Sequence, residues 1–220
     1  MNAGPFRELL ESRAAAANII LGSELVEKLE AYYRLLAHWN NRINLTSLAL
    51  EPPTVQTVDR LFLEPLVAAS LISQHVAVWF DLGTGGGSPA IPLQLAHPST
   101  RLIMVESRDR KAAFLREVIR ELALSGAEVE VSRIEVVARN YHNAGIADLV
   151  TVRAVRMAAS LYVDIQTLLR FGGQAVLFGS KQADLDLPRG LEELPATGGF
   201  QTLSTSLLAN QFAVLQKSGL

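Results

Sequence analysis

A glycine-rich segment at residues 81–87, Asp-Leu-Gly-Thr-Gly-Gly-Gly, constrains the fold of this chain more than any other feature. It directly follows His75-Val-Ala-Val-Trp-Phe-Asp81, a β-branched and aromatic run that predicts a buried strand. Open α/β sheets bind ligands at the carboxyl ends of their strands, where glycine lets the backbone turn sharply. The segment therefore predicts an α/β fold with a cofactor-binding turn after its first strand.

Strand-like and helix-like segments alternate after this point. Strands are expected at about residues 76–82, 101–106, 128–132, 148–153, 173–178 and 211–216. A clear helix is expected over 109–124, ahead of Gly126. This alternation predicts right-handed crossovers and a mostly parallel sheet with helices on both faces. The last strand is expected to close the sheet as a hairpin, which would make the sheet mixed.

The first 75 residues carry helical patterns and no strand pattern. Ser23 is a candidate N-cap for a helix whose apolar face holds Leu25, Leu29, Tyr32, Leu36 and Trp39. A second helix is expected after Pro52-Pro53, ending near Ser73. We therefore expect an N-terminal helical layer at 1–75 and a binding domain at 76–220, joined as one compact unit of 220 residues.

Composition excludes several kinds of site. The chain has no cysteine, which rules out disulfides, thiolate zinc sites and a cysteine nucleophile. Its four histidines show no metal-binding spacing, so no metal is expected. A formal net charge of −2 gives no global attraction to nucleic acid, and such binding must come from a local patch.

Neither a secretory signal nor a membrane span is expected. Charged residues interrupt the first 18 positions, where a signal peptide has an apolar core. The longest uncharged stretch without a glycine cluster, 65–80, is shorter than the ~18 apolar residues of a membrane span. The expected location is cytoplasmic.

The glycine spacing separates two cofactor classes. A dinucleotide fingerprint, GxGxxG, needs a third glycine where this chain has Ser88, whereas GxGxG matches Gly83, Gly85 and Gly87. Asp81 adds a carboxylate that disfavours a pyrophosphate and suits the ammonium and sulfonium of S-adenosylmethionine. Glu106, at the end of the second strand, can accept hydrogen bonds from ribose hydroxyls in either class.

Two other interpretations remain at this point. An NAD-dependent enzyme is the weaker cofactor alternative, because it also keeps an acid at the second strand end. The glycines can also form a tight turn with no ligand, beside a solvated Glu106.

Several ordered segments resemble one family. They are Trp39-Asn40, Asn44-Leu-Thr-Ser-Leu48, the glycine segment with Pro89-Ala-Ile-Pro-Leu93, Val105-Glu-Ser107 with Lys111 and Phe114-Leu115, and Asp148-Leu-Val-Thr-Val-Arg-Ala154. Together, over about residues 25–180, they resemble the glucose-inhibited division protein B family. That family contains bacterial methyltransferases that modify ring nitrogen 7 of a guanine in small-subunit ribosomal RNA.

The resemblance implies a Rossmann-like class I methyltransferase fold that binds S-adenosylmethionine. Asp81, Gly83, Gly85 and Gly87 would line its methionine end, Glu106 its ribose, and Ile134 and Glu135 its adenine edge. Arg153 matches a family arginine next to the cofactor and the target pocket, and is the candidate catalytic residue. The implied partner is small-subunit ribosomal RNA or the 30S particle, and a monomer is expected.

This chain departs from the family pattern at four places. Ser88-Pro89-Ala90 stands in place of Phe-Pro-Gly, Leu61 in place of a histidine, and Glu64-Pro65 in place of an acid-serine pair. Gly179 stands in place of a lysine, with Lys181 two residues later. An alternative is therefore a divergent, inactive or re-targeted relative that binds cofactor or RNA without this activity.

The chemistry places few demands on side chains. Guanine nitrogen 7 has a lone pair and no proton, so methyl transfer needs alignment and desolvation and no general base. RNA contacts are expected from cationic residues in 101–120, with Arg133, Arg139 and Arg156. Arg153 ends a buried apolar strand and needs a partner, which is either a ligand or an internal ion pair with Asp81 or Asp148.

Overall fold

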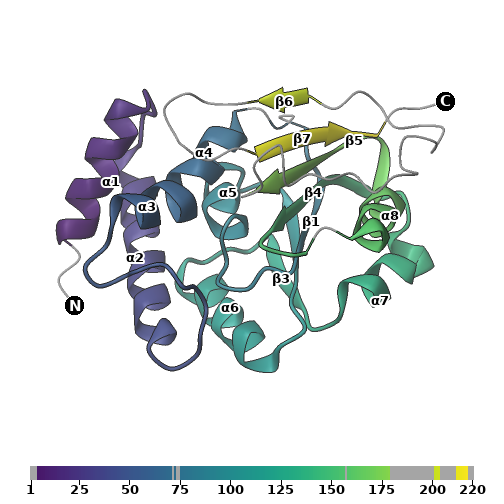
Figure 1. The fold of residues 1–220 in the computed structure, drawn as a ribbon, viewed down its shortest axis with the longest axis horizontal. Helices are drawn as coiled ribbons and strands as arrows, with labels where there is room; N and C mark the ends of the chain where they lie inside the picture. Colours follow the sequence, from purple (N-terminus) through teal and green to yellow (C-terminus); the bar gives the residue numbers. More distant parts are fainter. Residues whose placement is uncertain are drawn as a thin grey trace.

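One sheet with the strand order β3-β2-β1-β4-β5-β7-β6 organises the chain. The computed structural model describes residues 4–70, 72, 75–156, 158–178, 201–203 and 212–217. The strands are β1 Val78–Leu82, β2 Arg101–Val105, β3 Ala127–Glu130, β4 Ala147–Arg153, β5 Leu169–Phe178, β6 Gln201–Leu203 and β7 Phe212–Gln216. β1 to β5 pair in parallel, and β7 pairs antiparallel with β5 and β6 (Figure 1). The mixed, mostly parallel sheet confirms the expected fold class.

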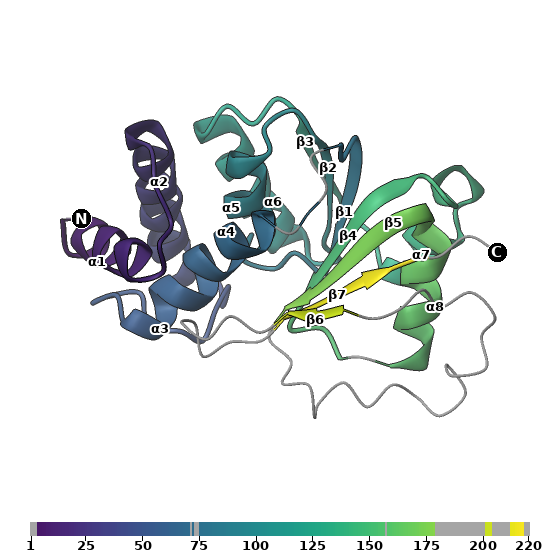
Figure 2. The same ribbon diagram turned by 90° about the horizontal axis from the view of Figure 1, so that it is seen from above.

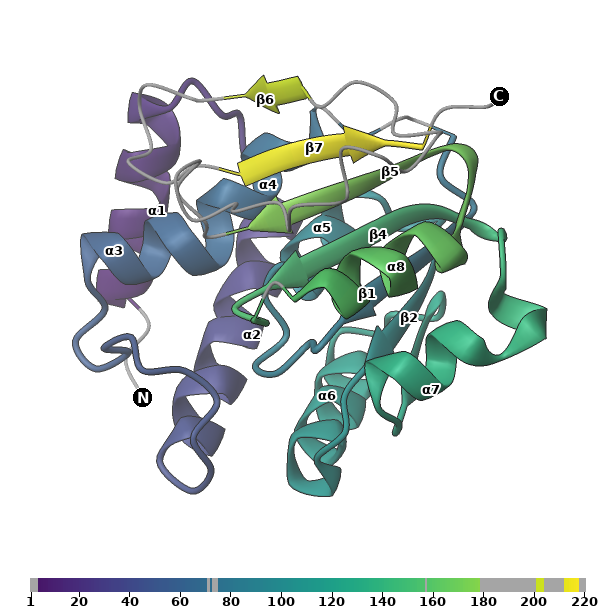
Figure 3. The ribbon, with the colours of Figure 1, turned by 45° about the vertical axis from the view of Figure 1, so that its right-hand side comes forward.

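Helices cover both faces of this sheet. One face carries α1 Gly4–Ala16, α2 Ser23–Asn40, α3 Val55–Val58, α4 Glu64–Ala69, α5 Ala90–Ala96 and α6 Asp109–Glu121. The other face carries α7 Ile134–Arg139 and α8 Ala159–Leu168. Figure 2 shows the sheet between the two groups, and Figure 3 shows α7 and α8 in front of it. Each group of helices shares its own apolar cluster with one face of the sheet.

The long helices follow from their apolar stripes, but their ends differ slightly from expectation. Ser23 is the first residue of α2, and Gly22 holds the capping position without a side-chain cap. The first helical hydrogen bond runs from Val26 N to Gly22 O, so the helix begins one residue earlier than a Ser23 cap would give. Helix α6 ends at Glu121, three residues before the expected 124.

A π-helical turn separates α3 from α4, and nothing in the sequence pattern indicated it. It spans Asp59–Leu63 and closes with a hydrogen bond from Glu64 N to Asp59 O. π turns inside helical segments are frequent at functional sites. The helical segment ends with α4 at Ala69, about four residues before the expected end near Ser73.

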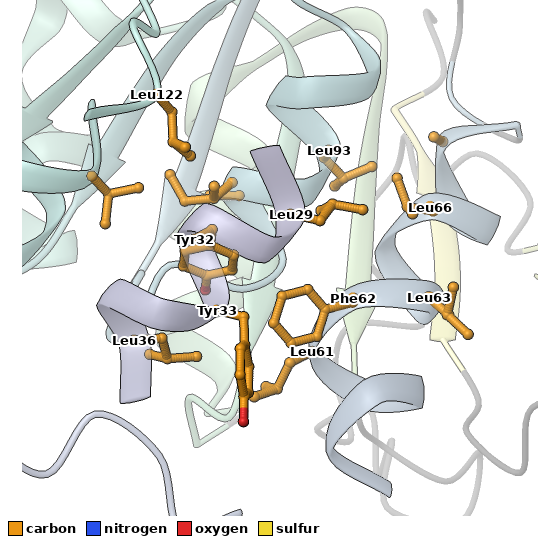
Figure 4. Close-up of a cluster of buried hydrophobic side chains, with 14 of the residues drawn as sticks. Leu29, Tyr32, Tyr33, Leu36, Leu61, Phe62, Leu63, Leu66, Leu93 and Leu122 are labelled. Carbon is orange, nitrogen blue, oxygen red and sulfur yellow. The ribbon is translucent and has the colours of Figure 1, made fainter. Parts of the chain in front are cut away.

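Aromatic side chains join the N-terminal helices to one another and to the sheet. Phe6 stacks on Tyr33 with ring centroids 4.1 Å apart, and Phe62 packs edge-on against Phe6 at 4.8 Å. Tyr32 and Phe62 lie side by side among leucines from α2, α4 and α5 (Figure 4). The same apolar cluster includes Trp79 of β1, so the helical layer and this face of the sheet share one core.

A helix that crosses a membrane must be long and apolar. None of the helices in the described ranges combines the length and the apolar character that a bilayer crossing requires.

The link between α2 and the glycine segment gives a stability prediction. The Tyr32 hydroxyl is buried and donates a 2.6 Å hydrogen bond to the Gly86 carbonyl. Tyr32→Phe removes this donor, so we expect the free energy of unfolding to fall by about 1–2 kcal/mol. Urea denaturation of the ligand-free protein measures the change.

A second tyrosine provides the matched control. The hydroxyl of Tyr162 in α8 is buried and has no hydrogen-bond partner among the described residues. Tyr162→Phe therefore removes only an unsatisfied polar atom. We expect its free energy of unfolding to stay unchanged or to rise slightly. Equal losses in both variants would contradict the role given to the Tyr32 hydrogen bond.

Candidate functional site

A cleft of about 410 Å³ opens at the carboxyl ends of β1, β2 and β4. Three strand-end segments contribute to its wall, and the N-terminal layer contributes the rest. From the strand ends come Gly83, Thr84, Gly85, Gly86, Ser88, Glu106, Arg108, Lys111, Arg153 and Ala154. From the helical layer come Tyr32, Leu36, Leu45, Thr46, Ser47 and Leu61.

The glycine segment needs glycine for two physical reasons. Gly83 has a φ of +73°, and a Cβ there would lie 2.7 Å from Val155 Cγ2. Gly86 meets the helical layer, because a Cβ there would lie 3.2 Å from the Leu45 carbonyl oxygen. Backbone conformation and a clash thus exclude a side chain at Gly83, and tight packing against a backbone carbonyl disfavours one at Gly86.

Glu106 directly follows β2, and its carboxylate is fixed by two backbone amides. Gly85 N donates to Glu106 Oε2 at 3.0 Å, and Arg108 N donates to Oε1 at 2.9 Å. Glu106 lines the cleft although it is largely buried. A carboxylate has about four acceptor positions, so both oxygens retain capacity to accept from ligand hydroxyls.

Asp81 lies buried at the end of β1, beneath the glycine turn. Its register partner on β4 is Thr151, whose hydroxyl donates to Asp81 Oδ1. Trp79 Nε1 in turn donates to the Thr151 hydroxyl oxygen at 2.8 Å. Burial raises the pKa of Asp81 to about 6, although the hydrogen bond from Thr151 works in the opposite direction. This carboxyl therefore changes its charge close to neutral pH.

Arg153 is the last residue of β4, and its side chain is 9% exposed at the cleft. Its Nη1 lies 2.9 Å from Glu64 Oε2, and its guanidinium lies over the Phe178 ring, 4.7 Å from the centroid. Burial lowers the pKa of Arg153, and the neighbouring Glu64 opposes that change. Arg153 thus brings a positive charge into an otherwise secluded position.

The partner expected for an internal ion pair of Arg153 was wrong. Asp148 lies near the opposite end of β4, where it pairs with Arg170 and accepts from the Ala77 and Val78 amides. Asp81 accepts its hydrogen bond from Thr151. The acid that pairs with Arg153 comes from the helical layer, which strand pattern alone does not place.

The structure brings only part of the expected site together. Gly83, Gly85, Glu106 and Arg153 line the cleft, and Asp81 is buried beneath it. Gly87 does not line the cleft, and neither do Ile134 and Glu135.

The two residues expected at the adenine edge lie at the start of α7. The Ile134 side chain comes within 3.9 Å of the position that a Cβ on Gly83 would take. Glu135 lies 3.8 Å from Arg133 in an ion pair. Their contact with an adenine stays a prediction.

Sequence reasoning missed residues that lie in the cleft and next to it. Tyr32 was placed on an apolar helix face, and its hydrogen bond to Gly86 crosses 54 residues of chain. Glu64 was noted only as a departure from a family pattern.

Gly179 and Lys181 lie outside the described residues. Within those residues, no group of three or more histidine or acidic side chains is arranged to hold a metal ion.

Known proteins resemble this chain in sequence. The family model described as rRNA small subunit methyltransferase G matches residues 25–211. A protein of Roseiflexus castenholzii named Ribosomal RNA small subunit methyltransferase G is 32% identical over 186 residues, which is 84% of this chain and 78% of that protein. A protein of the same name from Rubrobacter xylanophilus is 35% identical over 192 residues, 84% of this chain and 70% of that protein.

Solved structures resemble this chain in fold. The SAM-dependent O-methyltransferase from Thermotoga maritima matches with a TM-score of 0.60 at 13% identity, over 84% of this chain and 72% of that one. The fold is therefore the Rossmann-like class I methyltransferase fold. Since the family model spans most of the chain and the relatives exceed 30% identity, this chain belongs to the rRNA small subunit methyltransferase G family.

Proposed function

We propose that this protein is an S-adenosylmethionine-dependent methyltransferase that modifies ring nitrogen 7 of a guanine in small-subunit ribosomal RNA. One observation carries the proposal in a chain of this family. A single cleft combines a glycine turn over the buried Asp81 carboxyl with Glu106 and a cationic Arg153.

The residues around the cleft suit the charges of S-adenosylmethionine. Its ammonium and sulfonium favour a site with the carboxylates of Asp81 and Glu106. Its carboxylate favours a guanidinium, and the buried nitrogens of Arg153 have no hydrogen-bond partner of suitable angle among the described residues. An unsatisfied buried donor is costly unless a ligand pairs with it.

Each expected site residue receives a role in this proposal. Gly83, Gly85 and Gly87 shape the turn against the methionine end, with Asp81 beneath it. Glu106 accepts hydrogen bonds from the ribose, and Ile134 and Glu135 border the adenine. Arg153 is the catalytic residue, in contact with the cofactor or the guanine.

Methyl transfer to guanine nitrogen 7 requires the protein to align the two reactants and does not require it to transfer a proton. S-adenosylmethionine supplies a methyl group bonded to a positively charged sulfur. Guanine nitrogen 7 carries no proton, so no residue has to act as a general base. The apolar wall of Leu36, Leu45 and Leu61 removes water from the cleft, and the charged groups orient what binds there.

An NAD-dependent enzyme fits this cleft less well. Ser88 occupies the place of the third fingerprint glycine, and its hydroxyl donates a 2.8 Å hydrogen bond to the Leu61 carbonyl. A pyrophosphate would also lie close to the Asp81 and Glu106 carboxylates, where like charge opposes binding.

The substrate proposal rests on the rim of the cleft as well as on the family. Arg108 and Lys111 line the cleft, and both are suited to contact RNA phosphates.

We assign the 30S particle or its precursor as the form of the RNA that binds, and the cytoplasm as the location, since ribosomal RNA is there. We also propose that the protein acts as a monomer. We also treat 1–75 and 76–220 as one unit, because they share a core.

Methyl transfer tests the proposal directly. Small subunits that lack this modification are incubated with the protein and S-adenosylmethionine labelled in its methyl group, beside naked ribosomal RNA and protein alone. We expect label in the small-subunit RNA, recovered as 7-methylguanosine after digestion. Cofactor binding without transfer to either RNA would instead identify an inactive or re-targeted relative, which the apolar Leu61 in the cleft makes the second candidate.

Cofactor affinity should depend on pH through Asp81. The raised pKa of about 6 means that the carboxyl is mostly neutral at pH 5 and mostly ionised at pH 7. A cationic ligand binds the ionised form better, so affinity should rise with pH by about tenfold over this range. Isothermal titration with S-adenosylmethionine at pH 5, 6 and 7 measures it.

The Asp81→Asn variant provides the control. It should bind more weakly at pH 7 and show no rise with pH. A rise that persists in this variant would assign the effect to another carboxyl, such as Glu64, whose pKa is also raised by burial.

Glu106→Ala should weaken cofactor binding. The substitution removes acceptors for the ribose and leaves the Gly85 and Arg108 amides without their partner. We expect a loss of about 1–3 kcal/mol, a roughly 5- to 150-fold higher Kd by titration calorimetry. Glu128→Ala is the matched control, because Glu128 forms an exposed ion pair with Arg101 near the amino ends of β2 and β3. Equal effects of the two substitutions would argue against a cofactor at the end of β2.

A further inference from the structure

We propose that Glu64 is a positioning residue, which holds the Arg153 guanidinium at the cleft so that its free donors face the ligand. The inference rests on the proposed function, in which Arg153 contacts the cofactor or the guanine. It concerns a residue outside the cleft wall, since Arg153 lines the cleft and Glu64 does not.

Two neighbours fix the guanidinium from different sides. Phe178 is the register partner of Arg153 on β5, and its ring covers one face of the guanidinium at 4.7 Å. Glu64 approaches the edge, with 2.9 Å between Oε2 and Nη1. With a ring on one face and a charge at one edge, the Nε and Nη2 donors of the planar guanidinium stay buried and have no hydrogen-bond partner among the described residues.

The ion pair of Glu64 and Arg153 is almost fully buried, so water does not weaken it. Glu64 is fully buried, and neither of its carboxylate oxygens has a hydrogen-bond partner among the described residues. The same is true of the Arg153 nitrogens, so the 2.9 Å contact is an ion pair without good hydrogen-bond angles. Arg60 also lies near enough to influence the charge of both residues.

The π turn explains why an acid from the helical layer reaches this point. Residues five apart in an α-helix point about 140° away from each other. The hydrogen bond from Glu64 N to Asp59 O widens the turn by one residue and brings both acids to the buried side. Asp59 there pairs with Arg13, through hydrogen bonds of 2.9 and 2.7 Å, and Glu64 pairs with Arg153.

Stability is a weak explanation for this pair. Taking two charges out of water costs more than imperfect pairing returns, and apolar replacement of such pairs is often neutral or stabilising. A pair with poor hydrogen-bond angles, placed beside a cleft, is better explained by the orientation that it gives to Arg153.

A double-mutant cycle tests the inference. Glu64→Gln, Arg153→Met and the double variant are compared with the full-length protein for kcat and KM in methyl transfer to small subunits. Because Glu64 acts through Arg153, we expect Glu64→Gln to lower kcat about tenfold or more with little change in KM for the RNA. The double variant should then be no slower than Arg153→Met alone. Additive losses, or an unchanged kcat in Glu64→Gln, would overturn the inference.

Asp59→Asn provides the matched control. It removes an equivalent acid from the same π turn, whose hydrogen bond is made by the backbone, and its partner Arg13 lies outside the cleft wall. This variant should keep the kcat of the parent protein. An equal loss of kcat in Asp59→Asn and Glu64→Gln would indicate general damage to the turn and overturn the positioning role.

A spectroscopic measurement decides the question independently of activity. In protein labelled with ¹⁵N-arginine, the Nε–H signal of Arg153 is assigned by its loss in Arg153→Lys. We expect that signal to be shifted and slow to exchange with water in the parent protein, and to join the exposed arginines in Glu64→Gln. An unchanged signal would overturn the inference.

The two readouts also separate the failure of each proposal. Absence of methyl transfer by the parent protein would contradict the proposed function. The Arg153 signal would still show whether Glu64 positions the guanidinium. If Glu64→Gln does not fold, Glu64→Asp takes its place, because it keeps the charge and draws it back by one methylene. An unchanged kcat and an unchanged Arg153 signal in Glu64→Asp would then overturn the inference.

Discussion

The close approach of the N-terminal helices to the glycine turn is the contact on which the site depends. Tyr32 donates to the Gly86 carbonyl, and the Leu45 carbonyl lies so near Gly86 that a Cβ there would be 3.2 Å away. This contact closes one side of the cleft, and Asp81 is buried next to the turn. Burial then determines the electrostatics, because a carboxyl that loses water keeps its proton to higher pH.

Charge in this site comes from two layers of the molecule. The sheet provides Asp81 and Arg153 at the ends of neighbouring parallel strands, on the face that the helical layer covers. The helical layer provides Glu64, which directly follows the π turn. A regular α-helix would point Glu64 in a different direction. The pairing of a sheet residue with a helix residue thus couples the geometry of the cleft to the packing between the layers.

The residues of the cleft include some that match the family pattern and some that depart from it. Gly83, Gly85, Glu106 and Arg153 line one cleft, and their contacts with a cofactor stay predictions. Leu61 and Glu64, both departures from the family pattern, lie in or beside the same cleft. An apolar side chain at 61 changes what the cleft offers to a base, whereas an acid at 64 still provides a charge for Arg153.

The sequence by itself determined the order of the elements, the parallel sheet and the strand ends that bear the site, because alternating apolar patterns and glycine spacing are local signals. It placed Gly83, Gly85, Glu106 and Arg153 at one sheet edge, since the carboxyl ends of parallel strands meet there. The tertiary structure alone decided the partner of Arg153, the contact of Tyr32 with Gly86 and the burial of Asp81. The first two of these contacts depend on how the helical layer packs on a sheet that lies more than 50 residues away in the chain. The position of Glu64 also depends on a π turn, which changes the direction of the side chains that follow and which the sequence pattern does not indicate.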